Sequence, residues 1–341
     1  AISQVVYGPL SEGFGRRPIL IIGLIILIVG SGICYFSQNI NILIFGRFIQ
    51  GCGAGACAAL WRSVFRDVFS GEELAKYGSY LSVFMVLVVP AAPVIGGYLQ
   101  VYFNWRASFL FLSIYTIITL LLTSILFKET SKHHHKNRLK ISFILTTYGR
   151  LIKSRVFMGY SLCVFLTFGA FFSWFAVGPV LLIDILGYSP VAFGWMSMLT
   201  LCSAMVIGSI FNARLVEKFG LYIMLRFGWL LTFLSGAFML LTHWIFGINA
   251  YVIVSSIAIF YMGSTFIFAN TFAGAFAKCG KIAGFAGALY GTIQIAGGSA
   301  LGSVVSYLPD NNQIPLACVY LGCSAGAWII YKKIVRPAEQ F

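Results

Sequence analysis

The sequence predicts an all-α polytopic membrane protein, and three observations lead to this fold class. Of the 341 residues, 60% are hydrophobic and only 9% are charged, whereas soluble globular domains carry about 25% charged residues. The mean hydropathy is +0.92. Long stretches without any charge recur along the chain, and such unbroken apolar runs do not fit the alternating pattern of a membrane β-barrel.

The uncharged runs predict ten full membrane spans, because each span needs about 20 mostly apolar residues. The longest run is long enough for two spans, with a break near His243, Gly247 and Asn249. Residues 1–8 read as the end of another helix that enters a loop at Gly8. The runs are Pro18–Gly46, Phe48–Trp61, Tyr77–Trp105, Ala107–Phe127, Val156–Ile183, Ile185–Ala213, Phe227–Ala277, Ile282–Pro309 and Asn311–Tyr331.

The basic residues predict an orientation. When the loops are numbered alternately from Gly8, all 23 Lys and Arg residues except Arg47 and Arg106 fall on one side. Since basic loops are retained in the cytoplasm, we expect a multi-pass protein of the bacterial inner membrane with a cytoplasmic C-terminus. The net charge of +14 is spread over separate short loops, which argues against nucleic-acid binding.

An internal repeat divides the chain. Residues 8–15 resemble residues 213–220 at an offset of 205 residues, and Gly23 matches Gly228 at the same offset. Both copies begin on the same side of the membrane, so we expect two parallel halves. The expected organisation is an N-terminal half over residues 1–127, a basic cytoplasmic linker over 128–155 and a C-terminal half over 156–341.

The repeat also predicts what precedes residue 1. The repeated segment begins 57 residues after Val156 in the second half, so the first half would start about 50 residues before this sequence. We therefore expect that helix 1 and most of helix 2 are absent here and that the intact protein has twelve spans. His133–His135 lie in the basic linker, and we interpret them as part of a solvated charge patch. The eight cysteines are scattered along the chain, and we interpret them as core residues. We therefore expect no bound metal.

Four short segments stand out as motifs. They are Gly8-Pro-Leu-Ser-Glu-Gly-Phe-Gly-Arg-Arg17, Arg47-Phe-Ile-Gln-Gly-Cys-Gly53, Pro90-Ala-Ala-Pro-Val-Ile-Gly-Gly97 and Asn104-Trp105-Arg106. They resemble motifs of the major facilitator superfamily, and in particular of its bicyclomycin-resistance type of drug/proton antiporter. Glu12 stands where the first motif of that family usually has Asp, and Ala92 where the third has Gly.

The resemblance implies secondary active transport by two six-helix halves, with proton-coupled efflux of small lipophilic or amphipathic compounds. The chain has no G-x-x-x-x-G-K-[ST] loop for nucleotides, so we expect the proton gradient to drive transport without a cofactor. The expected partners are a small-molecule substrate, protons and the lipid bilayer, and the functional state is a monomer. A narrow-specificity metabolite or siderophore transporter and a non-transporting receptor or scaffold remain alternatives; no pattern of an enzyme is present.

Candidate cavity residues come from three helices. Arg47 lies in an apolar region on the side that has few basic residues, and Gln50 shares its helical face. A snorkelling arginine at the outer interface is the alternative for Arg47. By the family arrangement, Trp174, Phe175, Tyr261, Phe266 and Asn270 line the cavity, although packing against lipid or core remains open for each.

Candidate gating residues lie in the first and third motifs. A carboxylate at Glu12, beside Arg16 and Arg17, could reach the positive N-terminal end of a neighbouring helix and act as a latch; an ordinary polar turn is the alternative. Glu217 is the weaker counterpart in the second half. The other gating candidates should bend or closely pack one helix, namely Pro90, Pro93, Gly96 and Gly97.

Proton coupling calls for a titratable group within the membrane. Seven of the nine acidic residues fall with the cytoplasmic loops and tail, and Asp310 lies at an outer helix end. Asp184, also at an outer helix end, is the one candidate that this sequence offers. In related exporters this site lies on helix 1.

Overall fold

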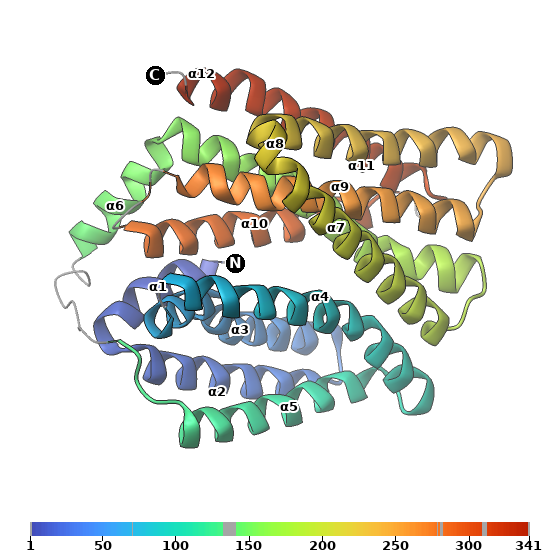
Figure 1. Ribbon diagram of the computed structural model, residues 1–341. Helices are drawn as coiled ribbons and strands as arrows, with labels where there is room; N and C mark the ends of the chain where they lie inside the picture. The colour runs from blue at the N-terminus through green and yellow to red at the C-terminus, as the bar shows by residue number, and fades with distance from the viewer. Residues whose placement is uncertain are drawn as a thin grey trace. The chain divides into compact units, whose positions relative to one another are not determined.

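The computed structural model describes residues 2–69, 71–131, 141–277, 279, 282–308 and 312–339. His133–His135 fall outside these ranges. The described chain is a series of helices (Figure 1): α1 Ile2–Phe14, α2 Arg16–Tyr35, α3 Ile40–Val68, α4 Gly71–Tyr102, α5 Trp105–Leu126, α6 Ile141–Lys153, α7 Arg155–Pro179, η2 Val180–Ile185, α8 Pro190–Phe246, α9 Ala250–Phe276, α10 Ala283–Ser306, α11 Ile314–Ile330, η4 Tyr331–Val335 and α12 Arg336–Glu339.

Nine of the described helices are long and apolar enough to cross a membrane. One of them, α8, has 57 residues, whereas a single span needs only about 20. Its backbone leaves the helical conformation at Gly220, so α8 comprises two spans joined at this residue. The predicted all-α polytopic fold is therefore confirmed, including the ten full spans.

Two expected helix boundaries are wrong. The chain does not enter a loop at Gly8, because α1 continues to Phe14 and the turn comes at Gly15. The uncharged run from Pro18 to Gly46 is not one span either, since α2 ends at Tyr35 and α3 begins at Ile40. Asn39 caps α3 by accepting a hydrogen bond from the backbone N–H of Ile42 at 2.9 Å.

Other helices begin with a side-chain cap in the same way. The side chain of Asn104 accepts hydrogen bonds from the first turn of α5, that of Ser189 from α8 and that of Asn249 from α9. Each cap supplies an acceptor for backbone N–H groups that have no partner within the helix. These residues thus set the helix ends at the short connections.

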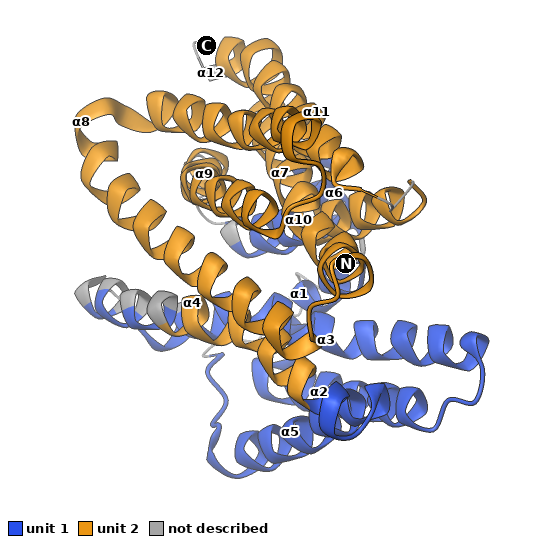
Figure 2. Cartoon of the chain, turned by 90° about the vertical axis from the view of Figure 1, so that its right-hand side faces the viewer, with its two compact units in different colours: residues 1–83, 99–151, 281–292 blue, residues 84–98, 152–280, 293–341 orange. Residues whose placement is uncertain are grey.

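The chain forms two compact units, coloured separately in Figure 2. The first comprises residues 1–83, 99–151 and 281–292, and the second residues 84–98, 152–280 and 293–341. In the first unit, α2 packs against both α3 and α5. In the second, α8, α9, α7 and α11 pack around a core that includes Trp174, Tyr261 and Tyr320.

Candidate functional site

The turn between α1 and α2 holds a network of polar side chains. Arg16 is only 8% exposed, and its Nε lies 3.0 Å from the Asp67 carboxylate of α3. Its Nη1 also donates to Ser11 Oγ at 2.5 Å. Arg17 donates from Nη2 to the Ser124 carbonyl oxygen of α5 at 2.6 Å. The two arginines therefore connect the start of α2 to α3 and to the end of α5.

Glu129 completes this network from the segment after α5. Its carboxylate accepts hydrogen bonds from the backbone N–H of Arg16 at 2.9 Å and of Arg17 at 3.1 Å. These donors belong to the first turn of α2, where N–H groups lack helical partners and favour negative charge. Burial alone would raise the pKa of Glu129, but the backbone donors, including Ser131 and Thr130, outweigh it and lower that pKa.

Glu12 lies at the N-terminal end of α10, within the first unit. A Cβ atom on Gly284 would be 2.9 Å from Glu12 Oε1, and one on Gly8 would be 3.3 Å from Ala288 Cβ. One turn further along α1, Gln4 Oε1 would be 3.0 Å from a Cβ on Gly291. The helices α1 and α10 therefore cross in antiparallel directions, with a glycine at each of these three contacts.

The helix α6 closes one side of this crossing. Tyr148 donates from its hydroxyl to the Val5 carbonyl oxygen of α1 at 3.0 Å, and its ring packs edge-on against Phe285 of α10. Burial, and then the neighbouring Glu12 carboxylate, raise the pKa of Tyr148. The Glu12 side chain thus lies among α1, α6 and α10.

A second crossing joins α4 to α8 within the second unit. A Cβ on Gly97 would lie 2.5 Å from the carbonyl oxygen of Pro190, whereas one on Gly96 would have no neighbour within 4 Å. A Cβ on Gly194 would be 2.8 Å from the carbonyl oxygen of Pro93. Pro90 and Pro93 both lie inside the continuous helix α4. Of the two adjacent glycines, only Gly97 makes the close approach.

Arg47 lies in the second turn of α3 and belongs to a polar chain in the first unit. Its Nη1 donates to Gln50 Oε1. Gln50 Nε2 in turn donates to Ser31 Oγ of α2 at 2.8 Å, and Ser31 donates to the Leu27 carbonyl oxygen at 2.8 Å. Gln50 is 4% and Ser31 0% exposed, while Arg47 is exposed. A buried amide thus holds the arginine at the surface of this unit.

The predicted aromatic residues of α7 and α9 meet in the core of the second unit. The ring of Tyr261 lies 4.6 Å from that of Phe171, which lies 6.1 Å from Phe175. Trp174 and Tyr261 are each 1% exposed. The Trp174 Nε1 and the Tyr261 hydroxyl have no hydrogen-bond partner in the described structure.

Sequence reasoning missed Tyr320 of α11, which belongs to the same core. Its ring stacks on Phe260 at 4.0 Å, and its buried hydroxyl also lacks a hydrogen-bond partner among the described residues. Unsatisfied buried polar atoms are uncommon in folded proteins. A polar residue isolated in an apolar helix was the signal that could have identified Tyr320.

The remaining predicted site residues lie apart from this core cluster. Phe266 packs edge-on against Phe227 of α8. Asn270 donates from Nδ2 to Asn212 Oδ1 at 2.8 Å, so Asn212 is a second residue that the sequence analysis overlooked. Asp184 is exposed in η2, and Glu217 is exposed one turn before Gly220. The structure therefore does not bring these two carboxylates into the buried clusters.

Comparison with models of known protein families identifies the family of this chain. The model of the Major Facilitator Superfamily matches residues 1–303. The chain belongs to this superfamily. Major facilitator proteins are transporters, so this chain is a membrane transporter and not an enzyme.

Two curated relatives show which members of the superfamily this chain resembles. The chain is 28% identical over 330 residues to the bicyclomycin resistance protein homolog of Haemophilus influenzae, covering 95% of this chain and 82% of that protein. It is 27% identical over 313 residues to multidrug resistance protein D of Escherichia coli, covering 92% and 77%. The resemblance to the bicyclomycin-resistance type is thereby confirmed.

The fold is also that of solved major facilitator structures. The xylose transporter XylE from Escherichia coli, in a partially occluded inward open conformation, aligns with a TM-score of 0.68 at 16% identity. The alignment covers 98% of this chain and 85% of that chain. At this identity the likeness shows the fold alone.

Proposed function

We propose that this major facilitator protein exports small lipophilic or amphipathic compounds in exchange for protons, by alternating access. It acts in the bacterial inner membrane as a monomer, with the C-terminus in the cytoplasm. The observation that carries this proposal is the pair of glycine-packed crossings, α1 with α10 and α4 with α8. Each joins a helix of the first sequence repeat to a helix of the second.

The composition of these crossings suits surfaces that separate and close again. Contacts at Gly97, Gly194, Gly8 and Gly284 bring backbone close to backbone or to a small group, so separation exposes little apolar side-chain area. In the α1–α10 crossing, the Glu12 carboxylate lies at the N-terminal end of α10, where a helix dipole favours a negative charge. This contact is the latch in the proposed cycle.

The core of the second unit supports a lipophilic substrate. Trp174, Tyr261 and Tyr320 are buried aromatic side chains, and each has one hydrogen-bonding atom without a partner among the described residues. Aromatic faces bind flat apolar or cationic groups, and the free N–H and hydroxyl groups can bind a few polar atoms. A sugar, which carries many hydroxyl groups, would need more polar partners than this cluster offers.

Arg47 is proposed to face the aqueous pathway. An arginine directed into lipid is costly, so charged residues within spans usually line polar cavities. The hydrogen bonds from Arg47 to Gln50 and from Gln50 to Ser31 hold the guanidinium to a buried amide. Such a fixed positive charge would sense a nearby carboxylate as it gains or loses a proton.

The proton site is proposed at Asp184, the one candidate carboxylate that the sequence analysis singled out. It lies in η2, two residues after the buried Leu182. Because Asp184 itself is exposed, the proposal requires the carboxylate to become buried during the transport cycle, which would raise its proton affinity. An Asp184→Asn variant that still binds drug but releases no protons is the expected result.

Proton flux in proteoliposomes tests the proposed function. Bicyclomycin and a panel of lipophilic cations and neutral metabolites are added to vesicles that contain a pH-sensitive dye. Proton movement driven by several unrelated lipophilic compounds is the expected result, and Arg47→Gln should abolish it, whereas Lys333→Gln should not. A response to one metabolite alone would contradict multidrug export, and no response to any compound would contradict transport by exchange.

A further inference from the structure

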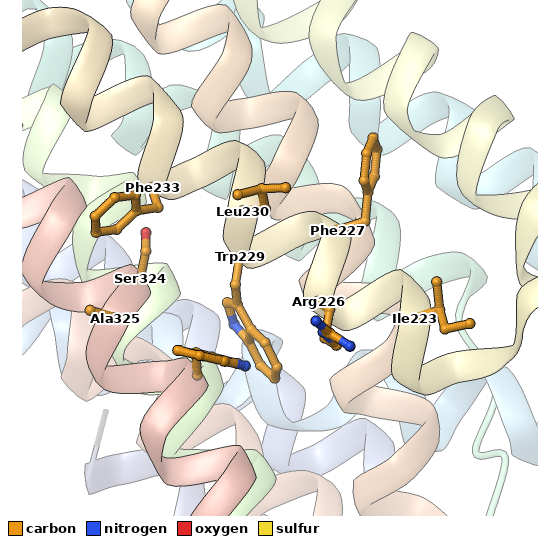
Figure 3. Close-up of a pocket in the computed structure, with 9 residues that line it drawn as sticks. Ile223, Arg226, Phe227, Trp229, Leu230, Phe233, Ser324 and Ala325 are labelled. Carbon is orange, nitrogen blue, oxygen red and sulfur yellow. The ribbon is translucent and has the colours of Figure 1, made fainter.

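A groove on the second unit is not used by the proposed transport cycle. It lies between the second span of α8 and α11, and its volume is 550 Å³ (Figure 3). The lining residues include pairs three or four apart on each helix, such as Phe227 and Leu230 on α8 and Ser324 and Trp328 on α11, so one face of α8 meets one face of α11. They are Ile223, Arg226, Phe227, Trp229, Leu230, Phe233, Ser324, Ala325 and Trp328.

Close packing at one end explains where the groove begins. A Cβ on Gly236 would lie 2.9 Å from the Ala317 carbonyl oxygen, and Ser324 donates to Thr232 Oγ1 at 2.9 Å. The α8 residues that line the groove all precede Gly236 and extend toward Gly220. The two helices therefore touch at Gly236 and leave the groove on the side of the Gly220 turn.

The walls of the groove are apolar and partly exposed. Phe227, Leu230, Phe233 and Trp328 each expose between 40% and 52% of their surface. Apolar side chains on the outside of a membrane protein contact acyl chains, because no water is present there. The groove thus has the chemistry of a surface that holds hydrocarbon.

Positive charge gathers at the end of the groove near the Gly220 turn. The guanidinium groups of Arg226 and Arg336 lie 5.5 Å and 5.0 Å from the centre of the same ring, that of Tyr222. Arg336 also lies within 3.5 Å of the Tyr222 hydroxyl, to which its Nη1 donates. Among the side chains that the structure describes, no carboxylate contacts either arginine. The two guanidinium groups near this ring repel each other, and an anion bound beside both of them would be attracted to each.

Trp229 supplies an independent observation inside the groove. It is 3% exposed, and its Nε1 has no hydrogen-bond acceptor in the part of the chain that the structure describes. Figure 3 shows Trp229 and Arg226 projecting from the same side of α8. A buried indole N–H normally finds an acceptor, so the missing partner points to a ligand with an acceptor oxygen.

We propose that this groove binds one anionic phospholipid. Its phosphate lies at Arg226 and Arg336, an ester carbonyl accepts a hydrogen bond from Trp229 Nε1, and one acyl chain follows Phe227, Leu230 and Phe233. Basic pockets between membrane helices bind anionic headgroups in this way. A cationic amphiphile of similar size would meet the same arginines with unfavourable charge. The inference does not depend on which compound is transported.

Native mass spectrometry of the detergent-solubilised protein tests the proposal. The protein is titrated with phosphatidylglycerol and, separately, with phosphatidylethanolamine of the same acyl chains. We expect one phosphatidylglycerol to be retained more tightly than phosphatidylethanolamine. The double variant Arg226→Gln/Arg336→Gln should bind phosphatidylglycerol at least about tenfold more weakly, while Trp229→Phe, which keeps the ring and removes the N–H, should weaken it by a smaller factor.

Controls separate this site from non-specific lipid binding. Arg214→Gln removes an exposed basic residue elsewhere on α8 and should leave phosphatidylglycerol binding unchanged, and thermal unfolding checks that every variant is folded. Equal retention of both lipids, or an equal effect of Arg214→Gln, would overturn the proposal. So would displacement by glycerol phosphate, which would indicate an anion site, or by a lipophilic cation, which would indicate a substrate site.

Discussion

Gly15 and Gly220 lie 205 residues apart and adopt nearly the same backbone conformation, with φ 101° and ψ 159° at Gly15 and φ 75° and ψ 166° at Gly220. Each comes directly after a phenylalanine, Phe14 or Phe219, and directly before a membrane span. Residues other than glycine rarely adopt such positive φ values. The sequence repeat is therefore also a repeat of backbone geometry.

A second glycine pair repeats the packing of these spans. A Cβ on Gly53 would lie 2.6 Å from the carbonyl oxygen of Gly23, and one on Gly263 would lie 2.9 Å from that of Gly228. Gly23 and Gly228 are again 205 residues apart. Each half thus brings the span after its turn into close contact with the next helix through two glycines.

The turn glycines provide a test that isolates backbone strain. Gly220→Ala should lower the free energy of unfolding by about 1–3 kcal/mol, because alanine disfavours this conformation although no atom lies within 4 Å of the new Cβ. Thermal unfolding in detergent measures the effect. Gly51→Ala also adds a Cβ in open space, without a positive φ, and should be neutral or slightly stabilising. Equal destabilisation by both variants would contradict this explanation.

Replacement of Glu129 tests the carboxylate that follows α5 and accepts hydrogen bonds from the first turn of α2. The hydrogen bonds to the N–H groups of Arg16 and Arg17 hold the pKa of Glu129 below its ordinary value. Since the folded state has the lower pKa, ionised Glu129 stabilises the protein above the unfolded pKa of about 4.5, and this contribution is lost as the pH falls. At pH 7 the melting temperature of Glu129→Gln should lie below that of the unaltered protein.

The same variant has a defined pH dependence. From about pH 5 down to about pH 2 the two melting temperatures should converge, because the unaltered carboxylate becomes protonated as the pH falls through its lowered pKa in the folded state. A difference that stays constant over this range would show that the charge of Glu129 does not contribute. A difference that grows as the pH falls would contradict the sign of the shift.

Loss of the ion pair between Arg16 and Asp67 should lower the free energy of unfolding more than loss of an exposed carboxylate. Asp67→Asn leaves the guanidinium of Arg16, which is 8% exposed, without its ionic partner 3.0 Å away. Because Asp67 remains partly exposed, we expect a loss of about 1–3 kcal/mol, less than for a fully buried pair. Glu73 is exposed on α4, and Glu73→Gln should change stability by less than about 0.5 kcal/mol. Similar effects of both variants on chemical denaturation would refute a special role for this pair.

Gly96 and Gly97 of α4 allow the effect of close packing on transport to be measured apart from the general effect of replacing a glycine. Gly97→Val places a side chain against the backbone of Pro190, whereas Gly96→Val places it in open space. Transport rate in proteoliposomes should therefore fall at least about tenfold in the first variant and stay within about twofold in the second, if the clash costs more than about 1.4 kcal/mol. The reverse order would show that the α4–α8 contact is not needed for transport.

The sequence predicts the fold well because membrane spans carry a strong local signal. Charge-free runs located the spans, and the repeat paired Gly15 with Gly220, although the first loop was expected to begin at Gly8 and not at Gly15. The break between α2 and α3 was expected at Arg47, because Ser37 and Gln38 at the true break carry no charge. The cap residue Asn39 was the available signal. Charge alone therefore finds spans but not every uncharged turn.

The site was less predictable because it depends on contacts between distant parts of the chain. Gln50 was chosen from its helical spacing to Arg47, and the two are hydrogen-bonded. The partner of Arg16, in contrast, is Asp67, 51 residues away, and that of Asn270 is Asn212, 58 residues away. No local pattern connects such residues. Only the packing of the helices brings them together.

Reversible cross-linking of the α4–α8 crossing tests the alternating-access account most directly. The side chains of Tyr98 on α4 and Trp195 on α8 meet across the crossing, with Trp195 Nε1 3.4 Å from the Tyr98 hydroxyl, so a bifunctional methanethiosulfonate reagent can join Tyr98→Cys to Trp195→Cys. The eight native cysteines are free and would first be replaced by serine or alanine. We predict that cross-linking of the double variant stops drug-driven proton flux and that dithiothreitol restores it, whereas the same reagent has no such effect on either single variant. Undiminished flux in fully cross-linked protein would contradict the account.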